Sequence, residues 1–75
     1  MTATEWEREL CLLFGEVLGM KDVDAEDSFF DLGGHSLLAS KLTRRVQDAF
    51  GIKIPVRRIY QASTPAALAA YLNAS

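Results

Sequence analysis

The sequence predicts a small all-α bundle of three main helices plus one short helix, with a long loop between helices 1 and 2. Three segments carry apolar residues at helical spacing, and residues typical of helix ends bound them. The alternation of apolar and polar residues that marks a strand is almost absent. Because 75 residues with a 49% hydrophobic share suffice for one core, we expect a single domain spanning residues 1–75.

The first helix is expected to begin near Thr4, with Thr4 as its N-cap, and to end at Gly19. Its apolar residues recur at intervals of three and four and therefore share one face of the helix: Trp6, Leu10, Leu13, Phe14 and Val17.

Residues 20–35 lack any periodicity, and Asp, Glu, Ser and Gly dominate the segment. A loop of this length is unusual in a compact domain unless it is functional or held by its own apolar side chains. We expect Phe29 or Phe30, together with Leu32, to enter the core and Val23 to hold the middle of the loop.

The second helix is predicted over residues 36–50 and ends at Gly51. Its core-facing residues are expected to be Leu38, Leu42, Val46 and Ala49.

Residues 52–54 are expected to be extended, because Ile54 precedes Pro55. Residues 56–60 are interpreted as a short helix with Val56, Ile59 and Tyr60 facing inward. Thr64 as N-cap and Pro65 at the first helical position predict the start of the last helix. Its inner side is expected to carry Leu68 and Leu72, with Tyr71 beside them.

Charge divides the chain into two halves. Residues 1–35 carry nine acids against Arg8 and Lys21, a balance of −7, and residues 36–75 carry six cations against Asp48, a balance of +5. The two halves either attract each other within the fold, or the basic half forms a docking face around the second helix.

Several classes of function are disfavoured. The single Cys11 cannot form an internal disulfide, no apolar run is long enough to span a bilayer, and the N-terminus lacks a signal-peptide pattern. We therefore expect a cytoplasmic protein without a membrane partner. Nucleic acid is also not expected as a partner, because the chain is acidic overall and an acidic loop precedes the basic second helix.

Ser36 is the main candidate for a modification site. It follows Gly33 and Gly34 and opens the second helix, where free backbone N–H groups and the helix dipole favour a phosphate. The glycines allow a sharp turn and leave the hydroxyl open to a large partner. The alternative is that Ser36 is only a helix cap. Leu37 should be exposed beside it, on the side of the helix that carries Lys41 and Arg44.

Catalysis by Ser36 itself is not expected. Position 38 is a leucine, whereas the hydrolase motif G-x-S-x-G has glycine there, and the chain is too short for the surrounding sheet. His35 has no second histidine or cysteine at metal-ligand spacing, so no metal site is expected. We expect His35 to frame the serine or to cap a neighbouring backbone group. Asp31 either orders the diglycine turn through side-chain bonds or is simply a solvated acid.

Residues 27–37, with the core Gly33-Gly34-His35-Ser36, closely resemble the carrier-site motif of peptidyl carrier proteins, the thiolation domains of nonribosomal peptide synthetases. Three further segments are similar to that family: residues 13–19, 52–55 and 63–65. The resemblance therefore covers nearly the whole chain.

This resemblance implies a non-catalytic carrier domain. Ser36 would be the covalent attachment site for 4′-phosphopantetheine from coenzyme A, flanked by Gly33, Gly34 and His35. A phosphopantetheinyl transferase would supply the metal and the general base. The arm would hold aminoacyl or peptidyl groups as thioesters.

The resemblance also implies partners. The monomeric domain would serve adenylation and condensation domains and, optionally, a thioesterase or tailoring domain, with Leu37, Lys41 and Arg44 as partner contacts and Leu38 in the core. The basic second helix differs from the acidic one typical of fatty-acid carriers. Two alternatives remain open: an acyl or aryl carrier of a polyketide or siderophore pathway, and a small helical protein-interaction domain in which Ser36 is only a cap.

Overall fold

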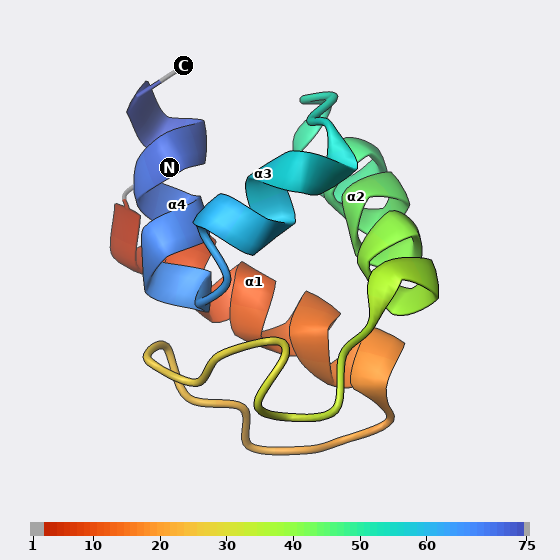
Figure 1. The fold of residues 1–75 in the computed structure, drawn as a ribbon. Coiled ribbons are helices and arrows are strands. Elements are labelled where there is room, and N and C mark those ends of the chain that lie inside the picture. The colour runs from red at the N-terminus through yellow and green to blue at the C-terminus, as the bar shows by residue number, and fades with distance from the viewer. Residues whose placement is uncertain (1–2, 75) are drawn as a thin grey trace.

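The structure is a computed structural model that describes residues 3–74. Four helices follow one another: α1 (Ala3–Leu18), α2 (Ser36–Phe50), α3 (Val56–Gln61) and α4 (Pro65–Ala74). α1 packs against both α4 and α2, α3 packs against α2, and the long loop passes beneath α1 in Figure 1. The predicted all-α class, three longer helices and one short one, and the long connection between α1 and α2 are confirmed.

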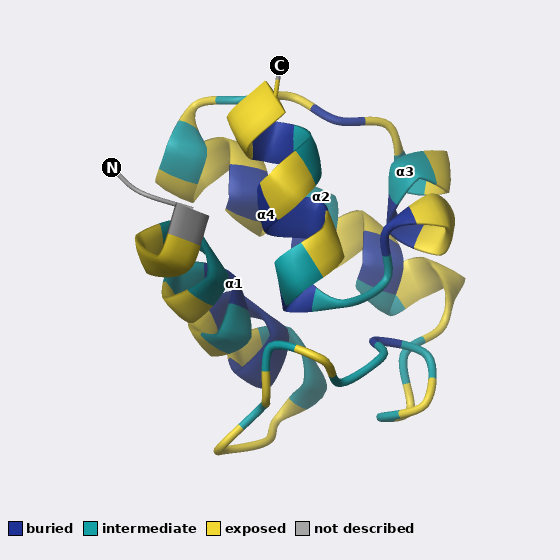
Figure 2. Cartoon of the chain, turned by 90° about the vertical axis from the view of Figure 1, so that its left-hand side faces the viewer, coloured by how far each residue is buried: buried dark blue, intermediate teal, exposed yellow. Residues whose placement is uncertain are grey.

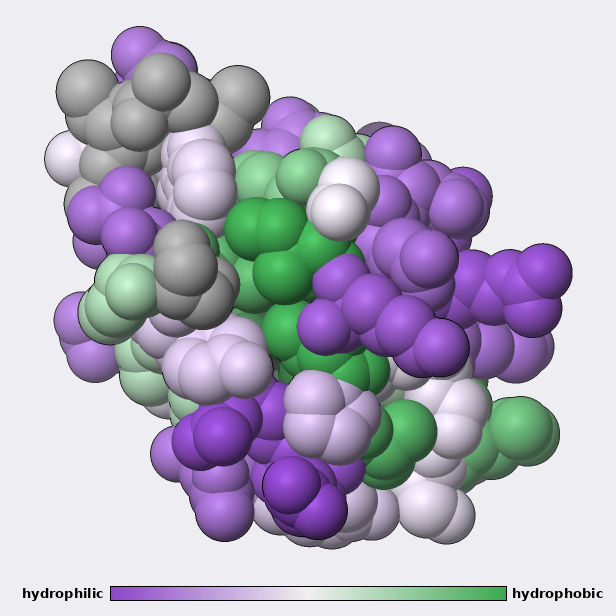
Figure 3. All heavy atoms as spheres, turned by 90° about the horizontal axis from the view of Figure 1, so that it is seen from above, coloured by the Kyte–Doolittle hydropathy of each residue, from purple (hydrophilic) through white to green (hydrophobic). Residues whose placement is uncertain are grey.

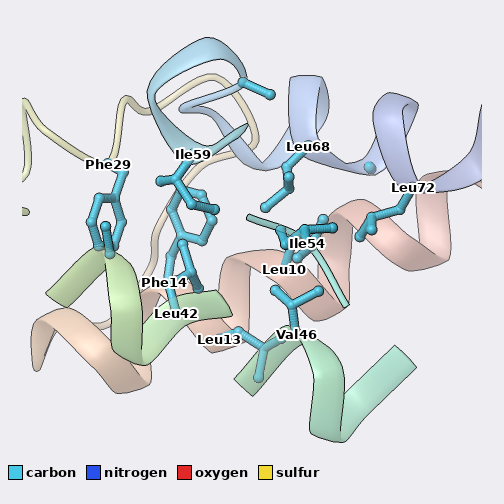
Figure 4. Close-up of a cluster of buried hydrophobic side chains, with 13 residues drawn as sticks. Leu10, Leu13, Phe14, Phe29, Leu42, Val46, Ile54, Ile59, Leu68 and Leu72 are labelled. Atoms are coloured by element: carbon cyan, nitrogen blue, oxygen red, sulfur yellow. The ribbon is translucent and has the colours of Figure 1, made fainter. Parts of the chain in front are cut away.

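One apolar core joins the four helices and the long loop. Buried residues occupy the inner sides of the helices, and exposed residues cover their outer sides (Figure 2). Figure 4 shows core side chains converging from every helix, from the long loop and from the segment between α2 and α3: Leu10, Leu13, Phe14, Phe29, Leu42, Val46, Ile54, Ile59, Leu68 and Leu72. The predicted stripe of α1 is confirmed, because Trp6 and Val17 pack half-buried against this cluster.

The start of α1 differs from the prediction, whereas its end agrees with it. The helix already includes Ala3, so Thr4 lies inside its first turn and its prediction as the N-cap is wrong. Threonine is tolerated there because its side chain is exposed. Gly19 ends the helix as predicted, with a φ of 70°, and the N–H of Met20 donates to the carbonyl of Gly15 at 2.9 Å.

α2 has the predicted bounds and ends at Gly51, whose φ is 71°. Leu42 and Val46 are buried and Leu38 is half-buried against the core, but Ala49 is exposed, so its placement in the core is wrong. Helical spacing gives the direction of a side chain but does not show whether a neighbour covers it. Near this end of α2, Trp6 packs on Phe50 with ring centroids 5.1 Å apart, and Ala49 is left uncovered.

The short helix α3 buries Ile59 and half-buries Val56, as predicted. The inward placement of Tyr60 is wrong, because 52% of its surface is exposed. Its ring instead stacks on Phe30 of the long loop, with centroids 4.7 Å apart and planes 15° from parallel. A stack between two distant segments cannot be inferred from helical spacing.

The predicted start of α4 is confirmed. The hydroxyl oxygen of Thr64 accepts a hydrogen bond from the N–H of Ala67 at 3.0 Å, and Pro65 is the first helical residue. Leu68 and Leu72 are buried, and Tyr71 is half-buried beneath the guanidinium of Arg58, 4.4 Å from the ring centroid.

Candidate functional site

Phe29 holds the segment that precedes Ser36 in place. Its ring is fully buried, and its edge meets the ring of Phe14 at a centroid distance of 5.3 Å. Its N–H donates to the carbonyl of Ser63 at 2.7 Å, and earlier in the loop the carbonyl of Ala25 accepts the N–H of Ala66 at 2.9 Å. The loop is therefore tied to the entry of α4 at two points.

The structure distinguishes the aromatic candidates that the sequence left open. Phe29 enters the core, and Phe30 is half-buried against its ring and that of Tyr60. Leu32 is half-buried but does not join the core, so that part of the prediction is wrong. Val23 packs half-buried against the core and holds the middle of the loop as predicted.

The two glycines before Ser36 are required for different reasons. Gly33 has a φ of +104°, which side chains rarely tolerate, and its N–H donates to the carbonyl of Phe30 at 3.2 Å. Gly34 donates its N–H to the carbonyl of Phe29 at 2.9 Å and lies so close that a Cβ would overlap the Phe29 ring. Gly33 therefore permits the turn, and Gly34 permits its close packing on the core.

Replacing Gly34 with alanine is expected to lower the free energy of unfolding by about 1–3 kcal/mol, because the added methyl group must displace the Phe29 ring or its backbone. Urea denaturation of the wild type and of Gly34→Ala measures this difference in the free energy of unfolding. Asp31→Ala is a matched control in the same loop, because Asp31 is exposed and hydrogen-bonds to no other described residue. Equal midpoints for the two variants would contradict the close approach seen here.

Ser36 is exposed and is the first residue of α2. The N-cap position belongs to His35, whose backbone is extended and whose carbonyl accepts the N–H of Ala39 at 2.8 Å. Among the described residues nothing hydrogen-bonds to the Ser36 hydroxyl. Its oxygen therefore lies free in the first turn, where backbone N–H groups without helical partners favour an anion.

His35 and Asp31 make no side-chain contribution to this turn. His35 is exposed and forms no capping bond through its ring, so of its two predicted roles, the capping of a backbone group is wrong. Asp31 is exposed and does not order the diglycine turn, because the bonds of that turn come from the backbone. The solvated acid is the interpretation that the structure supports.

Leu37 is 62% exposed, as its position on the helix predicted. Lys41 and Arg44 follow it at four and seven residues and are also exposed, so the three lie on one outer side of α2. The two residues that follow Leu37 face inward. Leu38 packs against the core, and Ala39 lies within it. Ala39 is fully buried although the sequence did not single it out, and its small side chain allows α2 to approach the neighbouring elements closely.

Within residues 3–74, neither Cys11 nor the acidic side chains form a second reactive site. The pKa of Cys11 is raised, first by burial and then by the neighbouring charges of Asp24, Glu7 and Asp27, so its thiol stays protonated at neutral pH. Within residues 3–74, no group of three or more His, Cys, Asp and Glu side chains could hold a metal ion. No helix in that part of the chain has the length and apolar character needed to cross a membrane.

The chain matches a known protein family over most of its length. A family model described as "Phosphopantetheine attachment site" matches residues 8–72. The chain belongs to this family. Among solved structures, a nonribosomal peptidyl carrier domain is 41% identical, with a TM-score of 0.82, over 93% of this chain and 90% of that one. The chain is thus a peptidyl carrier domain of the nonribosomal peptide synthetase type, and the predicted family is confirmed.

Relatives with named functions are far longer than this carrier domain. A protein of Salinispora arenicola named "Probable non-canonical nonribosomal peptide synthetase (NRPS) CymA" is 51% identical over 67 residues, which are 89% of this chain and 1% of CymA. A dimodular nonribosomal peptide synthase of Bacillus subtilis is 46% identical over 70 residues, 93% of this chain and 3% of the synthase. The carrier domain of a complex between the phosphopantetheine transferase Sfp, coenzyme A and a peptidyl carrier protein is 28% identical with a TM-score of 0.88, over 93% of this chain and 91% of that one.

Proposed function

We propose that this carrier domain, residues 1–75, holds aminoacyl or peptidyl groups on a 4′-phosphopantetheine arm attached to Ser36 and delivers them to partner domains of a nonribosomal peptide synthetase. The observation that carries the proposal is the free, exposed hydroxyl of Ser36 at the first residue of α2. A phosphodiester at this oxygen would lie at the positive end of the helix. A serine serving only as a cap would occupy the N-cap position, which belongs to His35.

The domain contributes only a nucleophilic hydroxyl to the attachment reaction. The Oγ of Ser36 attacks the pyrophosphate of coenzyme A, an Oγ–P bond forms, and the P–O bond to adenosine 3′,5′-bisphosphate breaks. The hydroxyl proton passes to a base of the transferase, because no described residue of this chain hydrogen-bonds to the hydroxyl. The arm, when attached, supplies a terminal thiol that holds the acyl group as a thioester. Gly33, Gly34 and the backbone of His35 set the position of Ser36. The domain contributes a high local concentration of the tethered acyl group at its partner domains.

The partners that we assign are a phosphopantetheinyl transferase and the adenylation and condensation domains of a synthetase. A similar domain has been solved with a transferase and coenzyme A, and a 41% identical domain has been solved within a four-domain nonribosomal peptide synthetase bound to AMP and glycine. We assign the contacts with these partners to Leu37, Lys41 and Arg44, which are exposed next to Ser36.

Incubation of the apo protein with coenzyme A and a broad-specificity phosphopantetheinyl transferase tests the proposal. We expect the mass of one phosphopantetheine to appear on the intact protein, and peptide mapping to place it on the fragment that contains Ser36. A protein that remains unmodified, or one modified elsewhere, would refute the assignment.

Leu37→Asp is expected to slow this modification by about tenfold or more, because a central apolar contact is replaced by a charge. The melting temperature should stay nearly unchanged, since the side chain is 62% exposed. Leu12→Asp is the matched control, because Leu12 is 61% exposed on the outer side of α1. Steady-state kinetics with both variants should show a loss for Leu37→Asp alone, and equal losses would contradict the assigned contact.

A further inference from the structure

The segment that leads into Ser36 is a compact turn, residues 28–34, which we call the serine turn. Three backbone hydrogen bonds close it, each from an N–H to a carbonyl: Leu32 to Ser28 at 3.0 Å, Gly33 to Phe30 at 3.2 Å and Gly34 to Phe29 at 2.9 Å. His35 follows directly as the N-cap of α2. The orientation of the serine turn therefore determines where the first turn of α2, and with it Ser36, lies.

Two adjacent aromatic rings attach the serine turn to the helices. Of its apolar side chains, only Phe29 lies in the core and only Phe30 packs against it. Phe29 fixes one point, because its ring is buried and its N–H donates to the carbonyl of Ser63 at the entry of α4. A turn held at one point can still rotate about it. Phe30 supplies the second point, since its ring stacks on Tyr60 of α3.

The stack has a geometry in which each ring supports the other. The centroids of Phe30 and Tyr60 lie 4.7 Å apart with planes 15° from parallel, and the other ring contact of Phe30 is edge-on to Phe29 at 5.4 Å. An aromatic pair of this kind shifts an equilibrium by about two- to tenfold beyond the effect of the area it buries. That factor is enough to favour one orientation of the serine turn over looser ones.

Tyr60 stands on a well-held helix and is still accessible from solvent. Within α3, Ile59 is fully buried, and the guanidinium of Arg58 lies 4.4 Å from the ring centroid of Tyr71 in α4. Tyr60 itself is 52% exposed. On the upper side of the molecule, where α3 lies in Figure 1, apolar side chains reach the surface between hydrophilic ones (Figure 3). The stack can therefore be altered without opening the core.

We propose that Tyr60 is a positioning residue for the modification of Ser36. Its ring fixes that of Phe30, the carbonyl of Phe30 accepts the N–H of Gly33, and the chain then continues through His35 to the serine. Tyr60 thus acts at a distance, through the serine turn, and does not touch the reacting hydroxyl. This inference rests on the proposed function, because the position of Ser36 matters only if the arm is attached there.

Amide hydrogen exchange of the apo domain, followed by NMR, tests the inference without any partner. Tyr60→Ala should speed exchange of the Gly33 and Gly34 N–H groups by about two- to tenfold, because their hydrogen bonds close the serine turn. Tyr60→Phe keeps the ring and should exchange as the wild type does. Gln61→Ala is the matched control, because Gln61 is exposed next to Tyr60. Unchanged exchange in Tyr60→Ala would overturn the inference.

A second variant separates the stack from the stability of the whole domain. Val46→Ala leaves a cavity in the core, on a part of α2 remote in sequence from the serine turn. It should speed exchange of the buried Leu10 amide, which reports global unfolding, and leave Gly33 and Gly34 unchanged. If Val46→Ala sped exchange at the two glycines as much as Tyr60→Ala does, global stability would explain the effect and the inference would be wrong.

Modification kinetics separate positioning from direct contact with the transferase. Lys41 and Arg44, which we assign to docking, lie further along α2 than the serine turn reaches. We therefore expect Tyr60→Ala to lower kcat by about two- to tenfold and to change KM by less than about twofold, and Tyr60→Phe to restore kcat. A raised KM with an unchanged kcat would make Tyr60 a docking contact and would overturn the inference.

The two proposals fail in distinguishable ways. Amide exchange of the apo protein reports on the serine turn whether or not Ser36 is the attachment residue. Absence of a phosphopantetheine on the wild-type protein refutes the proposed function without altering the exchange of Gly33 and Gly34.

Discussion

Replacing Ser36 with alanine is expected to abolish attachment of the phosphopantetheine arm and to leave the fold intact. The substitution removes the hydroxyl oxygen that we assign as the nucleophile. The hydroxyl hydrogen-bonds to no described residue, and the backbone of His35 rather than Ser36 occupies the N-cap position. The free energy of unfolding should therefore change by no more than about 0.5 kcal/mol.

Mass spectrometry after incubation with coenzyme A and a transferase measures the loss, and a thermal melt measures the stability. Ser40→Ala is the matched control, because Ser40 is also exposed and lies one turn further along α2. The control should take up the arm as the wild type does. Residual modification of Ser36→Ala would show that another residue is the acceptor, and a large loss of stability would show that the hydroxyl has a structural role.

Replacing Phe29 with alanine is expected to destabilise the domain more than any other single change discussed here. The ring is fully buried against Phe14 and Phe30, and the backbone of Gly34 packs directly on it. Removing such a ring typically costs about 3–5 kcal/mol. Because small domains have a total stability near the lower end of about 5–15 kcal/mol, the variant should be largely unfolded at moderate temperature.

Near-UV circular dichroism and urea denaturation measure this effect. The neighbouring Phe30→Ala serves as the control, since Phe30 is only half-buried and stacks on the exposed Tyr60. It should lose clearly less stability than Phe29→Ala. If the two variants melted within a few degrees of each other, the central position of Phe29 in the core would be wrong.

Features that depend on neighbouring residues in the chain were predictable. The bounds of α2, its end at Gly51 and the cap of α4 by Thr64 all follow from local backbone preferences and short hydrogen bonds. The exposure of Leu37 was also predictable, because helical spacing placed it opposite the buried Leu42. Sequence reasoning therefore predicted that α2 begins at Ser36 and that Leu37 beside it is exposed.

Predictions that depended on distant neighbours were less successful. Ala49 and Tyr60 were assigned to the core from their spacing, yet one has no covering element and the other stacks on the loop. Thr4 was taken as a cap, although α1 already includes Ala3. In each case the residue type was compatible with two positions, and its surroundings decided between them.

Local chemistry alone thus specified four helices, their glycine and threonine boundaries, and a serine at the start of α2. Only packing between distant segments selected Phe29 rather than Phe30 for the core and brought Gly34 against its ring. The physical reason is that backbone preferences and helical spacing act over a few residues, whereas burial and surface charge depend on which elements meet in space.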